Sequence, residues 1–485
     1  MVNDDDIDTL RAKRLCHQCV GEKYLRSEVQ HKGKRGQCSY CGQSLRSYTI
    51  EDIAECVKTA FEQHFRRTSD QPTYWQQAML SDRESNYDWE REGEPVEEAI
   101  EYAAEIPEQA AQDIQAILDD EHSDFDSAAM GEETEFCPGS YYVEKETRDD
   151  EWQEEWRFFE HSLKTEARFF SRAAAEHLAS IFKGIDKMPT TDGRFLVIDA
   201  GPQKTVNEIF RSRVFQSQEK LKEALCRPDL HLGSPPSVLA IAGRMNATGI
   251  SVFYGTTKPD LAIAEVRPPV GGRVAIARFD IVRPLRLLDL AALSAVIEEG
   301  SVFDPGWAAR LERATFLRSL SQRMTMPVMP DDEALDYLPT QAIADFLATE
   351  NDFVLDGIVF PSVQAAGDGL NIVLFHKAAR VEAIEIPEKT EIEASTGQMS
   401  EDGWEVDYSV FERVPSEKPV NEKDDEDRRT DFTADAYSAH GSDFRDITLR
   451  IDLKSVKVHV VSRVKFESDA RDVQRYRVEK TSPNF

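Results

Sequence analysis

Apolar positions in the first 190 residues recur at helical spacing. Ile53, Cys56, Val57, Ala60 and Phe61 follow the three-and-four spacing that places side chains on one face of an α-helix. The same pattern continues over residues 156–182, so we expect one long packed helix there. Its apolar stripe consists of Phe158, Phe159, Leu163, Ala167, Phe170, Ala174, Leu178, Ile181 and Phe182. The acidic stretch between these patterns, residues 81–155, is predicted to be partly solvated helix and partly flexible loop.

After residue 190 the pattern changes to short apolar runs bounded by glycine and proline, which is typical of strands. The predicted strands are 195–200, 237–243, 250–255, 274–281, 356–362 and 371–375. Helical patterns lie at 260–266, 290–300, 307–324 and 339–349. We therefore expect an α+β domain over residues 195–385. Apolar and polar residues alternate again at 449–466, and we expect strands there that return to pair with the sheet of this domain.

The charge of the chain argues against a general nucleic-acid binder. The 485 residues carry a formal net charge of -32, whereas nucleic-acid binders gather positive charge to neutralise phosphates. No apolar run approaches the roughly 18 residues that a membrane helix requires. The N-terminus is acidic, unlike a signal peptide, so we expect a cytoplasmic protein.

Four of the seven cysteines are spaced like metal ligands. Residues 16–41 contain Cys-x2-Cys, eighteen residues, and a second Cys-x2-Cys. Two such turns supply the four thiolates of a closed tetrahedral zinc site. We expect a structural zinc that gives this short segment its folding free energy. The predicted ligands are Cys16, Cys19, Cys38 and Cys41. Basic residues around them leave a docking surface as the alternative role of the segment.

The sign of the charge reverses within residues 201–290, which hold 13 basic against 8 acidic residues. A local basic pocket is an obvious way for an acidic protein to hold an anionic ligand. Four short segments there carry polar candidates for such a site. They are Arg211 and Arg213 in IFRSRVF, Arg244, Asn246 and Tyr254 in AGRMNATGISVFYG, Glu265 in DLAIAEVRP, and Ser362 and Asn371 in DGIVFPSVQAAGDGLNIVLF.

In this order the four segments resemble the RES family, which is named for its Arg, Glu and Ser. The resemblance covers about residues 195–385, with the spacing from Tyr254 to Glu265, the Asp-Gly segment before Ser362 and YLPTQAIADF at 337–346 as its marks. Members are similar in fold to ADP-ribosyltransferases, and several are toxins that destroy NAD by hydrolysis or phosphorolysis. The resemblance implies an NAD glycohydrolase or NAD phosphorylase, with ADP-ribosyl transfer to a macromolecule left open.

The resemblance also implies roles for the candidates. Glu265 would stabilise the ribosyl cation that forms as nicotinamide leaves, and Arg211 would bind the pyrophosphate or an attacking phosphate. Tyr254 would stack on nicotinamide or ribose, and Ser362 would orient the substrate amide or Glu265. The expected catalytic residues are thus Glu265, Arg211, Ser362 and Tyr254, and the expected NAD-binding residues are Arg244, Asn246, Arg213 and Asn371.

The N-terminal part resembles the HEPN/RES N-terminal domain, best in WRFFEHSLKTEARFF at 156–170. It contains Arg172 and His177, an Arg-x4-His pair similar to the motif of HEPN-type ribonucleases. Five residues apart on a helix place the two side chains on different faces, and the acidic surroundings repel RNA. We therefore favour a solvated Arg172 and a packed His177, with a ribonuclease and a nucleotide-binding scaffold as alternative functions.

These observations predict five segments. They are a zinc ribbon at 1–48, an acidic helical HEPN-like domain at 49–188, the RES domain at 195–385, a flexible acidic linker at 386–446 and a C-terminal β segment at 447–485. Because an enzyme that consumes NAD threatens its own cell, we also expect restraint by the N-terminal half or by an inhibitory or sensing protein partner. We expect no membrane partner.

Overall fold

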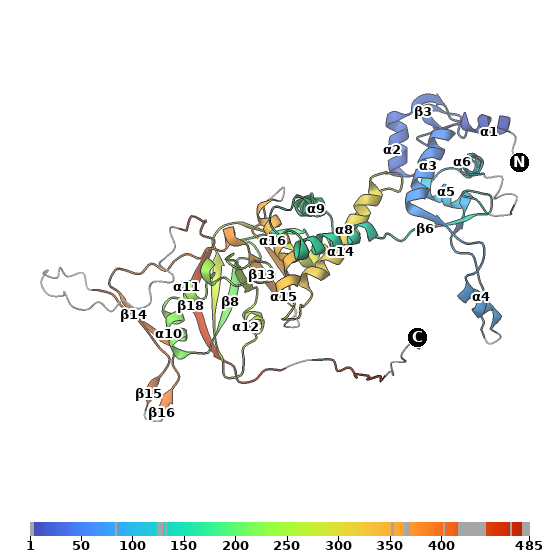
Figure 1. Cartoon of the computed structure of the whole chain (residues 1–485). Helices are drawn as coiled ribbons and strands as arrows, with labels where there is room; N and C mark the ends of the chain where they lie inside the picture. The colour runs from blue at the N-terminus through green and yellow to red at the C-terminus, as the bar shows by residue number, and fades with distance from the viewer. Residues whose placement is uncertain are drawn as a thin grey trace. The chain divides into compact units, whose positions relative to one another are not determined.

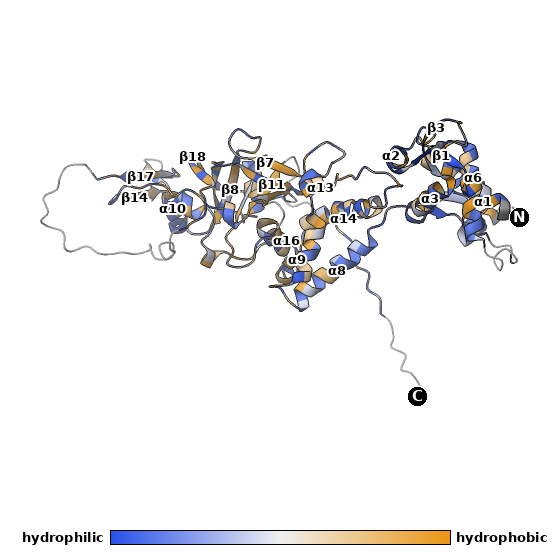
Figure 2. Cartoon of the chain, turned by 90° about the horizontal axis from the view of Figure 1, so that it is seen from above, coloured by the Kyte–Doolittle hydropathy of each residue, from blue (hydrophilic) through white to orange (hydrophobic). Residues whose placement is uncertain are grey.

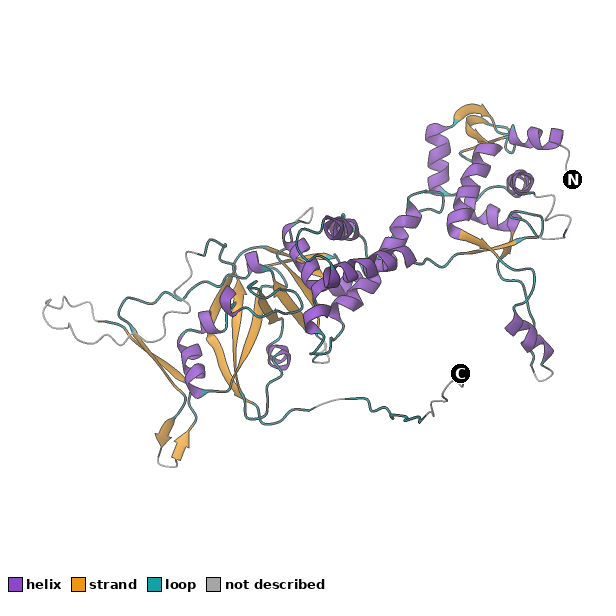
Figure 3. Cartoon of the chain, in the orientation of Figure 1, coloured by secondary structure: helices purple, strands orange, loops and turns teal. Residues whose placement is uncertain are grey.

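The computed structural model describes residues 4–82, 85–123, 130, 133–350, 354–362, 364, 369–400, 403–415, 443–465 and 468–477. The chain forms two compact units. The N-terminal unit comprises Met1–Leu196 and Ala292–Met324, and the C-terminal unit comprises Val197–Ala291 and Thr325–Phe485. Both units contain helices and strands (Figure 3), so the predicted α+β class is confirmed.

The N-terminal unit combines two small antiparallel sheets with helices. One sheet has the strand order β1-β3-β2 and the other β4-β6-β5. The strands are β1 (Arg14–Cys16), β2 (Lys34–Gln37), β3 (Ser44–Thr49), β4 (Phe65–Arg67), β5 (Glu94–Pro95) and β6 (Tyr141–Glu144). The helices are α1 (Asp4–Arg11), α2 (Lys23–Lys32), α3 (Ile50–His64), α4 (Tyr74–Ser81), α5 (Val96–Ala104), α6 (Glu108–His122), α8 (Asp150–Thr165), α9 (Arg172–Phe182), the 3-10 turn η1 (Ile185–Lys187) and α14 (Trp307–Thr325).

Helix α3 confirms the helical pattern at residues 53–61. Thr49 caps it in a capping box with Asp52, which satisfies backbone groups at the helix start. Its apolar face is buried against α6 of the acidic region, and α6 packs on α5 in the same core. Each helix exposes its charged face and buries aliphatic residues such as Ile100 and Ile114. The high acidity of residues 81–155 is thus compatible with a packed core.

The single long helix predicted over 156–182 is wrong, because the structure has two helices there. Helix α8 ends at Thr165, and Ser171 starts α9 by accepting a hydrogen bond from the Ala174 N–H. Phe170 lies between them with a φ of 61°, outside the helical range. Phe158 and Phe170, two residues of the predicted stripe, are 61% and 104% exposed. A serine that caps a new helix interrupts the apolar period here.

An eight-stranded sheet dominates the C-terminal unit, in the order β18-β10-β8-β9-β13-β12-β11-β7 (Figure 1). All neighbouring pairs are antiparallel except β11 and β12. The strands are β7 (Val197–Ala200), β8 (Glu208–Phe215), β9 (Phe253–Thr256), β10 (Arg273–Ile281), β11 (Leu285–Asp289), β12 (Gly357–Pro361), β13 (Leu370–Leu374) and β18 (Leu449–Val460). Figure 2 shows apolar residues, in orange, along these strands.

Short helices accompany the sheet in the sequence. They are α10 (Gln218–Cys226), α11 (Pro228–His231), η2 (Ser237–Leu239), α12 (Pro259–Glu265), α13 (Leu290–Leu293), α15 (Glu333–Asp336), α16 (Leu338–Thr349) and η3 (His376–Ala378). The core centres on Phe253 of β9 and Phe279 of β10, whose ring centroids lie 5.0 Å apart. Among the described residues, no helix is sufficiently long and apolar to span a membrane.

The C-terminal strand behaves as predicted. Strand β18 pairs with β10 over the full length of β10, from Arg273 opposite Val460 to Ile281 opposite Leu449, with one irregularity after Ile276. Residues 449–460 therefore supply an edge strand of the central sheet, separated from β8 by β10.

Three local predictions differ from the structure. The run at 237–243 is the turn η2 followed by loop, because its backbone is used to hold the side chain of Asn246 and not to pair in a sheet. The helical pattern at 290–300 gives only the single turn α13. The region predicted as linker contains strands β14 (Glu391–Ser395), β15 (Gln398–Ser400), β16 (Gly403–Glu405) and β17 (Ser409–Arg413), while residues 416–442 lie outside the described residues.

Candidate functional site

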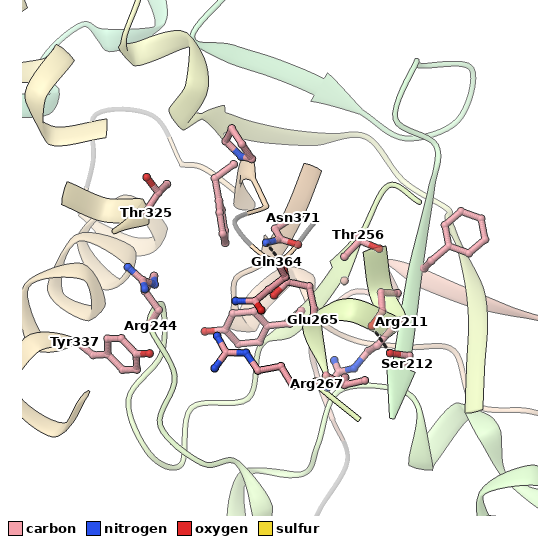
Figure 4. A pocket seen from close by; sticks show the side chains of 17 residues that line it. Arg211, Ser212, Arg244, Thr256, Glu265, Arg267, Thr325, Tyr337, Gln364 and Asn371 are labelled. Carbon is pink, nitrogen blue, oxygen red and sulfur yellow. Dashed lines mark hydrogen bonds between the residues drawn. The ribbon is translucent and has the colours of Figure 1, made fainter. Parts of the chain in front are cut away.

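A cavity of about 340 Å³ opens in the C-terminal unit, beside strands β8, β9, β13 and β12. These strands are neighbours in the sheet, so segments far apart in the sequence meet there. Figure 4 shows Arg244, Tyr337 and Thr325 on one side and Arg211, Ser212 and Thr256 on the other, with Glu265, Gln364 and Asn371 between them. The cavity holds three arginines and a single carboxylate among its described lining residues.

Glu265, the last residue of α12, is held by two side chains from neighbouring strands. Its Oε1 accepts hydrogen bonds from Ser362 Oγ at 2.5 Å and from Asn371 Nδ2 at 2.8 Å. The sheet register explains why Ser362 and Asn371 lie close together. Phe360 of β12 pairs with Asn371 of β13, and Ser362 follows the end of β12. In the part of the chain that the structure describes, Glu265 Oε2 makes no hydrogen bond. One carboxylate oxygen is thus fixed by two donors, which leave the other oxygen unused.

Helix α12 is itself anchored to β8. Ser212 Oγ donates a hydrogen bond to the carbonyl of Ala262, in the middle of α12. Ser212 is buried, so this bond links the strand of Arg211 to the helix of Glu265 in a site shielded from water. This bond therefore fixes β8 and α12 to each other, and with them the positions of Arg211 and Glu265.

Arg211 is partly buried in the cavity wall, and the Nη1 atom of its guanidinium is fully buried. Its guanidinium lies 4.8 Å above the centroid of the Phe253 ring, and its Nη1 has no hydrogen-bond partner. Burial, and to a smaller extent the neighbouring charge of Arg213, lowers the pKa of Arg211 to about 10. The group is therefore charged at neutral pH. A buried cation without a partner is costly to the fold and suits an anionic ligand.

Tyr254 is hydrogen-bonded to the loop that carries Arg244 and Asn246. Its hydroxyl donates to Asn246 Oδ1 at 2.9 Å and accepts from the Met245 N–H at 3.0 Å. Burial raises the pKa of Tyr254 to about 12, so the phenol stays neutral. A Cβ on Gly243 would lie 2.8 Å from this hydroxyl, which explains why glycine occupies that position. The ring of Tyr254 lines the cavity, while its polar end is committed to the loop.

Arg244 lies at the opposite end of the cavity from Arg211. Its guanidinium is 5.4 Å from the centroid of the Tyr337 ring, and its carbonyl accepts a hydrogen bond from Thr340 at 2.6 Å. Burial and a hydrogen bond to Glu333 raise the pKa of Tyr337, and the charges of Arg244 and Arg267 partly offset this rise. The positive charges of Arg244 and Arg267 thus both act on the Tyr337 hydroxyl.

The structure brings most of the predicted site residues together. The cavity is lined by five of them, namely Arg211, Arg244, Tyr254, Glu265 and Asn371, and Ser362 binds Glu265. Asn246 is buried and donates to the carbonyls of Ile241, Ala247 and Ile250. Arg213 does not line the cavity, because its guanidinium donates to the carbonyl of His231 at 2.9 Å. The latter two residues therefore contribute to the frame of the site.

Other lining residues were missed by the sequence reading. They include Arg267, Tyr337, Gln364 and Thr325. Tyr337 begins YLPTQAIADF, and Arg267 follows Glu265 by two residues. Their position within or beside segments that resemble the RES family could have identified them as site residues. Gln364 is tied to the site by its backbone N–H, which donates to Ser362 Oγ at 3.0 Å.

The four predicted metal ligands meet in the N-terminal unit. The Sγ atoms of Cys16, Cys19, Cys38 and Cys41 all lie within 4.8 Å of one another. The separations are 3.7 Å for Cys16 to Cys19, 3.6 Å for Cys16 to Cys41 and 3.9 Å for Cys19 to Cys38. Tetrahedral zinc with Zn–S bonds of about 2.3 Å requires sulfur separations of about 3.8 Å. The four thiols therefore fit zinc, and the donor set is closed, as a structural site requires.

Arg172 and His177 lie on α9 in different surroundings. Arg172 is exposed at the start of the helix. The His177 ring packs near Trp152, Trp156 and Phe159, with Nδ1 3.2 Å from a Glu155 carboxylate oxygen. Burial lowers the pKa of His177, although Glu155 opposes this shift. The hollow beside this histidine is lined by four glutamates, which repel phosphates.

Comparison with known families identifies two regions of the chain. The RES domain matches residues 227–396, and HEPN/RES N-terminal domain 1 matches residues 31–177. The first match contains the cavity residues from Arg244 to Asn371, and Arg211 precedes it. No curated protein and no solved structure matches the chain.

Proposed function

Since this chain belongs to the RES proteins that carry a HEPN/RES N-terminal domain, we propose that its cavity cleaves the bond between nicotinamide and ribose in NAD. RES domains typically act on NAD as enzymes. The observation that carries the proposal is the carboxylate of Glu265, fixed by Ser362 and Asn371 in a cavity with three arginines.

The reaction requires stabilisation of positive charge on the sugar. When the bond from C1′ to the nicotinamide nitrogen breaks, the nitrogen keeps the electron pair and nicotinamide leaves neutral, so no general acid is needed. The ribose then carries the charge of an oxocarbenium-like ion. Glu265 offsets this charge with a preorganised carboxylate, and Ser362 and Asn371 prevent it from turning away. Either water forms the new bond to C1′ through its oxygen and loses a proton to solvent, or phosphate forms it through an oxygen that is already deprotonated.

Arg211 and Tyr254 complete the proposed site. The unpartnered Nη1 of Arg211 binds an anionic oxygen of the dinucleotide or of an attacking phosphate. The ring of Tyr254 provides a flat wall for nicotinamide or ribose and excludes water. Restraint of this activity by the N-terminal half of the chain, or by a partner protein, remains a prediction.

The test is incubation of the purified full chain with NAD, with and without phosphate, followed by chromatography of the products. ADP-ribose indicates hydrolysis, and ADP-ribose 1″-phosphate indicates phosphorolysis. Glu265→Gln should lower turnover about 10²- to 10³-fold, the usual cost of removing a transition-state electrostatic contact. Glu219→Gln, on the exposed face of α10, is the matched control and should retain full activity.

Two results would contradict the proposal. Binding of NAD without any turnover by the unaltered chain favours the nucleotide-binding scaffold. Turnover that survives in Glu265→Gln, with an unchanged unfolding temperature, removes Glu265 from the reaction.

A further inference from the structure

Arg267 lines the cavity and has no role in the cleavage proposed above. Its side chain makes no hydrogen bond or ion pair with any residue that the structure describes. Figure 4 shows its guanidinium reaching from the Glu265 segment across the cavity, toward the side of Arg244 and Tyr337. The carboxylate of Glu265, two residues earlier, is bound instead by Ser362 and Asn371. The two opposite charges thus share a cavity without neutralising each other.

The backbone of Arg267 is held in a conformation that its sequence disfavours. Its φ is 44°, in the left-handed region where a Cβ is strained and glycine is the usual residue. Pro268 follows, and proline favours an extended conformation in the residue before it. The turn is held by the Arg267 N–H, which donates to the Ala264 carbonyl at 3.1 Å and ends α12. Strained residues of this kind cluster at ligand sites.

We propose that Arg267 binds a phosphate of the nucleotide whose ribose is held at Glu265. The inference rests on the proposed function and assigns a residue that recognises the phosphate of the substrate. A guanidinium presents a planar pair of donors that matches two phosphate oxygens, and the donors of Arg267 are not used by any residue that the structure describes. The site therefore selects phosphorylated nicotinamide nucleotides, both NAD and the mononucleotide, over nicotinamide riboside, which has the same bond to cleave.

The first experiment compares steady-state kinetics of the unaltered chain and Arg267→Gln with three substrates. The variant should raise KM for NAD and for nicotinamide mononucleotide about 10- to 100-fold, the range expected for losing a hydrogen bond between charged groups. The kcat should change less than about twofold, since the contact is equal in ground and transition states. The KM for nicotinamide riboside should not change. Arg273→Gln at the start of β10, outside the cavity, should match the unaltered chain for all three.

The second experiment does not depend on turnover. Calorimetry measures the binding of ADP-ribose, which keeps both phosphates, to Glu265→Gln and to the double variant with Arg267→Gln. The double variant should bind about tenfold more weakly or worse. If NAD is not cleaved at all, this measurement still tests Arg267. Equal binding by the two proteins would overturn the inference, as would an equal rise in KM for the riboside and for NAD.

Discussion

Arg91 in the N-terminal unit and Arg211 in the C-terminal unit both have guanidinium groups withdrawn from water, but they differ in their partners. Arg91 donates to both carboxylate oxygens of Glu133, at 2.9 and 2.6 Å, and to the carbonyls of Thr68 and Gly139. Arg211 has an aromatic ring above it and an unpartnered Nη1. The hydrogen bond from Arg91 lowers the pKa of Glu133, so that pair is a mutual stabilisation.

The comparison distinguishes polar groups whose hydrogen bonds stabilise the fold from polar groups whose unused hydrogen-bonding capacity suits a ligand. In the N-terminal unit the Arg91 network and the cysteine cluster are closed, since their donors and acceptors satisfy each other or a metal. In the C-terminal unit three residues line the cavity with unsatisfied polar groups. Arg211 Nη1 and Asn371 Oδ1 are buried without a hydrogen-bond partner, and the Arg267 side chain has none among the described residues. Substitutions at closed sites should therefore change stability, and substitutions at the open site should change ligand binding.

The largest effect on stability is expected at the cysteine cluster. Removal of the metal by a chelator, or Cys38→Ser, should unfold the segment around β1 and β2, because structural zinc supplies about 10–16 kcal/mol of apparent binding free energy. Metal content by mass spectrometry and unfolding by circular dichroism measure this. Cys226→Ser, outside the cluster, is the control. A metal-free chain that unfolds like the original would show that the cluster is not a zinc site.

The next effect is expected at Arg91. Arg91→Gln leaves Glu133 without its main partner and should lower the free energy of unfolding by about 2–3 kcal/mol. Denaturant titration measures this change. Arg66→Gln breaks an exposed pair with Glu92 and should cost about 1 kcal/mol or less. Equal values for the two variants would mean that the Arg91 network adds nothing to the fold.

The smallest change in stability, with the opposite sign, is expected at Arg211. Arg211→Met replaces a buried cation lacking partners by an apolar side chain, so the free energy of unfolding should rise by about 1 kcal/mol. The affinity for NAD should fall at least about tenfold. Arg273→Met controls for the loss of charge. If Arg211→Met lowers the free energy of unfolding, then Arg211 stabilises the fold as Arg91 does, and the contrast between the two arginines is wrong.

The sequence predicted those parts of the fold in which local pattern and burial agree. The paired cysteine spacing identified the metal cluster, and the alternation at 449–466 identified β18. The long helix over 156–182 was wrong because Ser171 caps a new helix within an unbroken apolar pattern. Residues 237–243 were read as a strand because apolar composition does not distinguish a paired strand from a loop whose backbone binds Asn246.

The candidate site was predicted to the extent that recognisable segments carry it. Glu265, Ser362 and Asn371 were chosen as a set through the resemblance to the RES family, and the register of β12 and β13 brings Ser362 and Asn371 within hydrogen-bonding distance of Glu265. Arg267 was missed because its direction depends on a left-handed turn that opposes its own sequence preference. Arg213 was expected in the site because it lies in the same segment, IFRSRVF, as Arg211, but its guanidinium donates to the carbonyl of His231 and does not line the cavity.

The position of β18 has a consequence for the timing of assembly during translation. Strand β10 has β8, which carries Arg211, on one side and β18 on the other. Residues 282–448 must leave the ribosome before β18 does, which takes roughly 10 to 30 s at usual elongation rates. The nascent chain thus exists for that interval with a central strand still exposed along one edge. The eight-stranded sheet is complete only after residues 449–460 have been synthesised, so a product that terminates before them lacks β18.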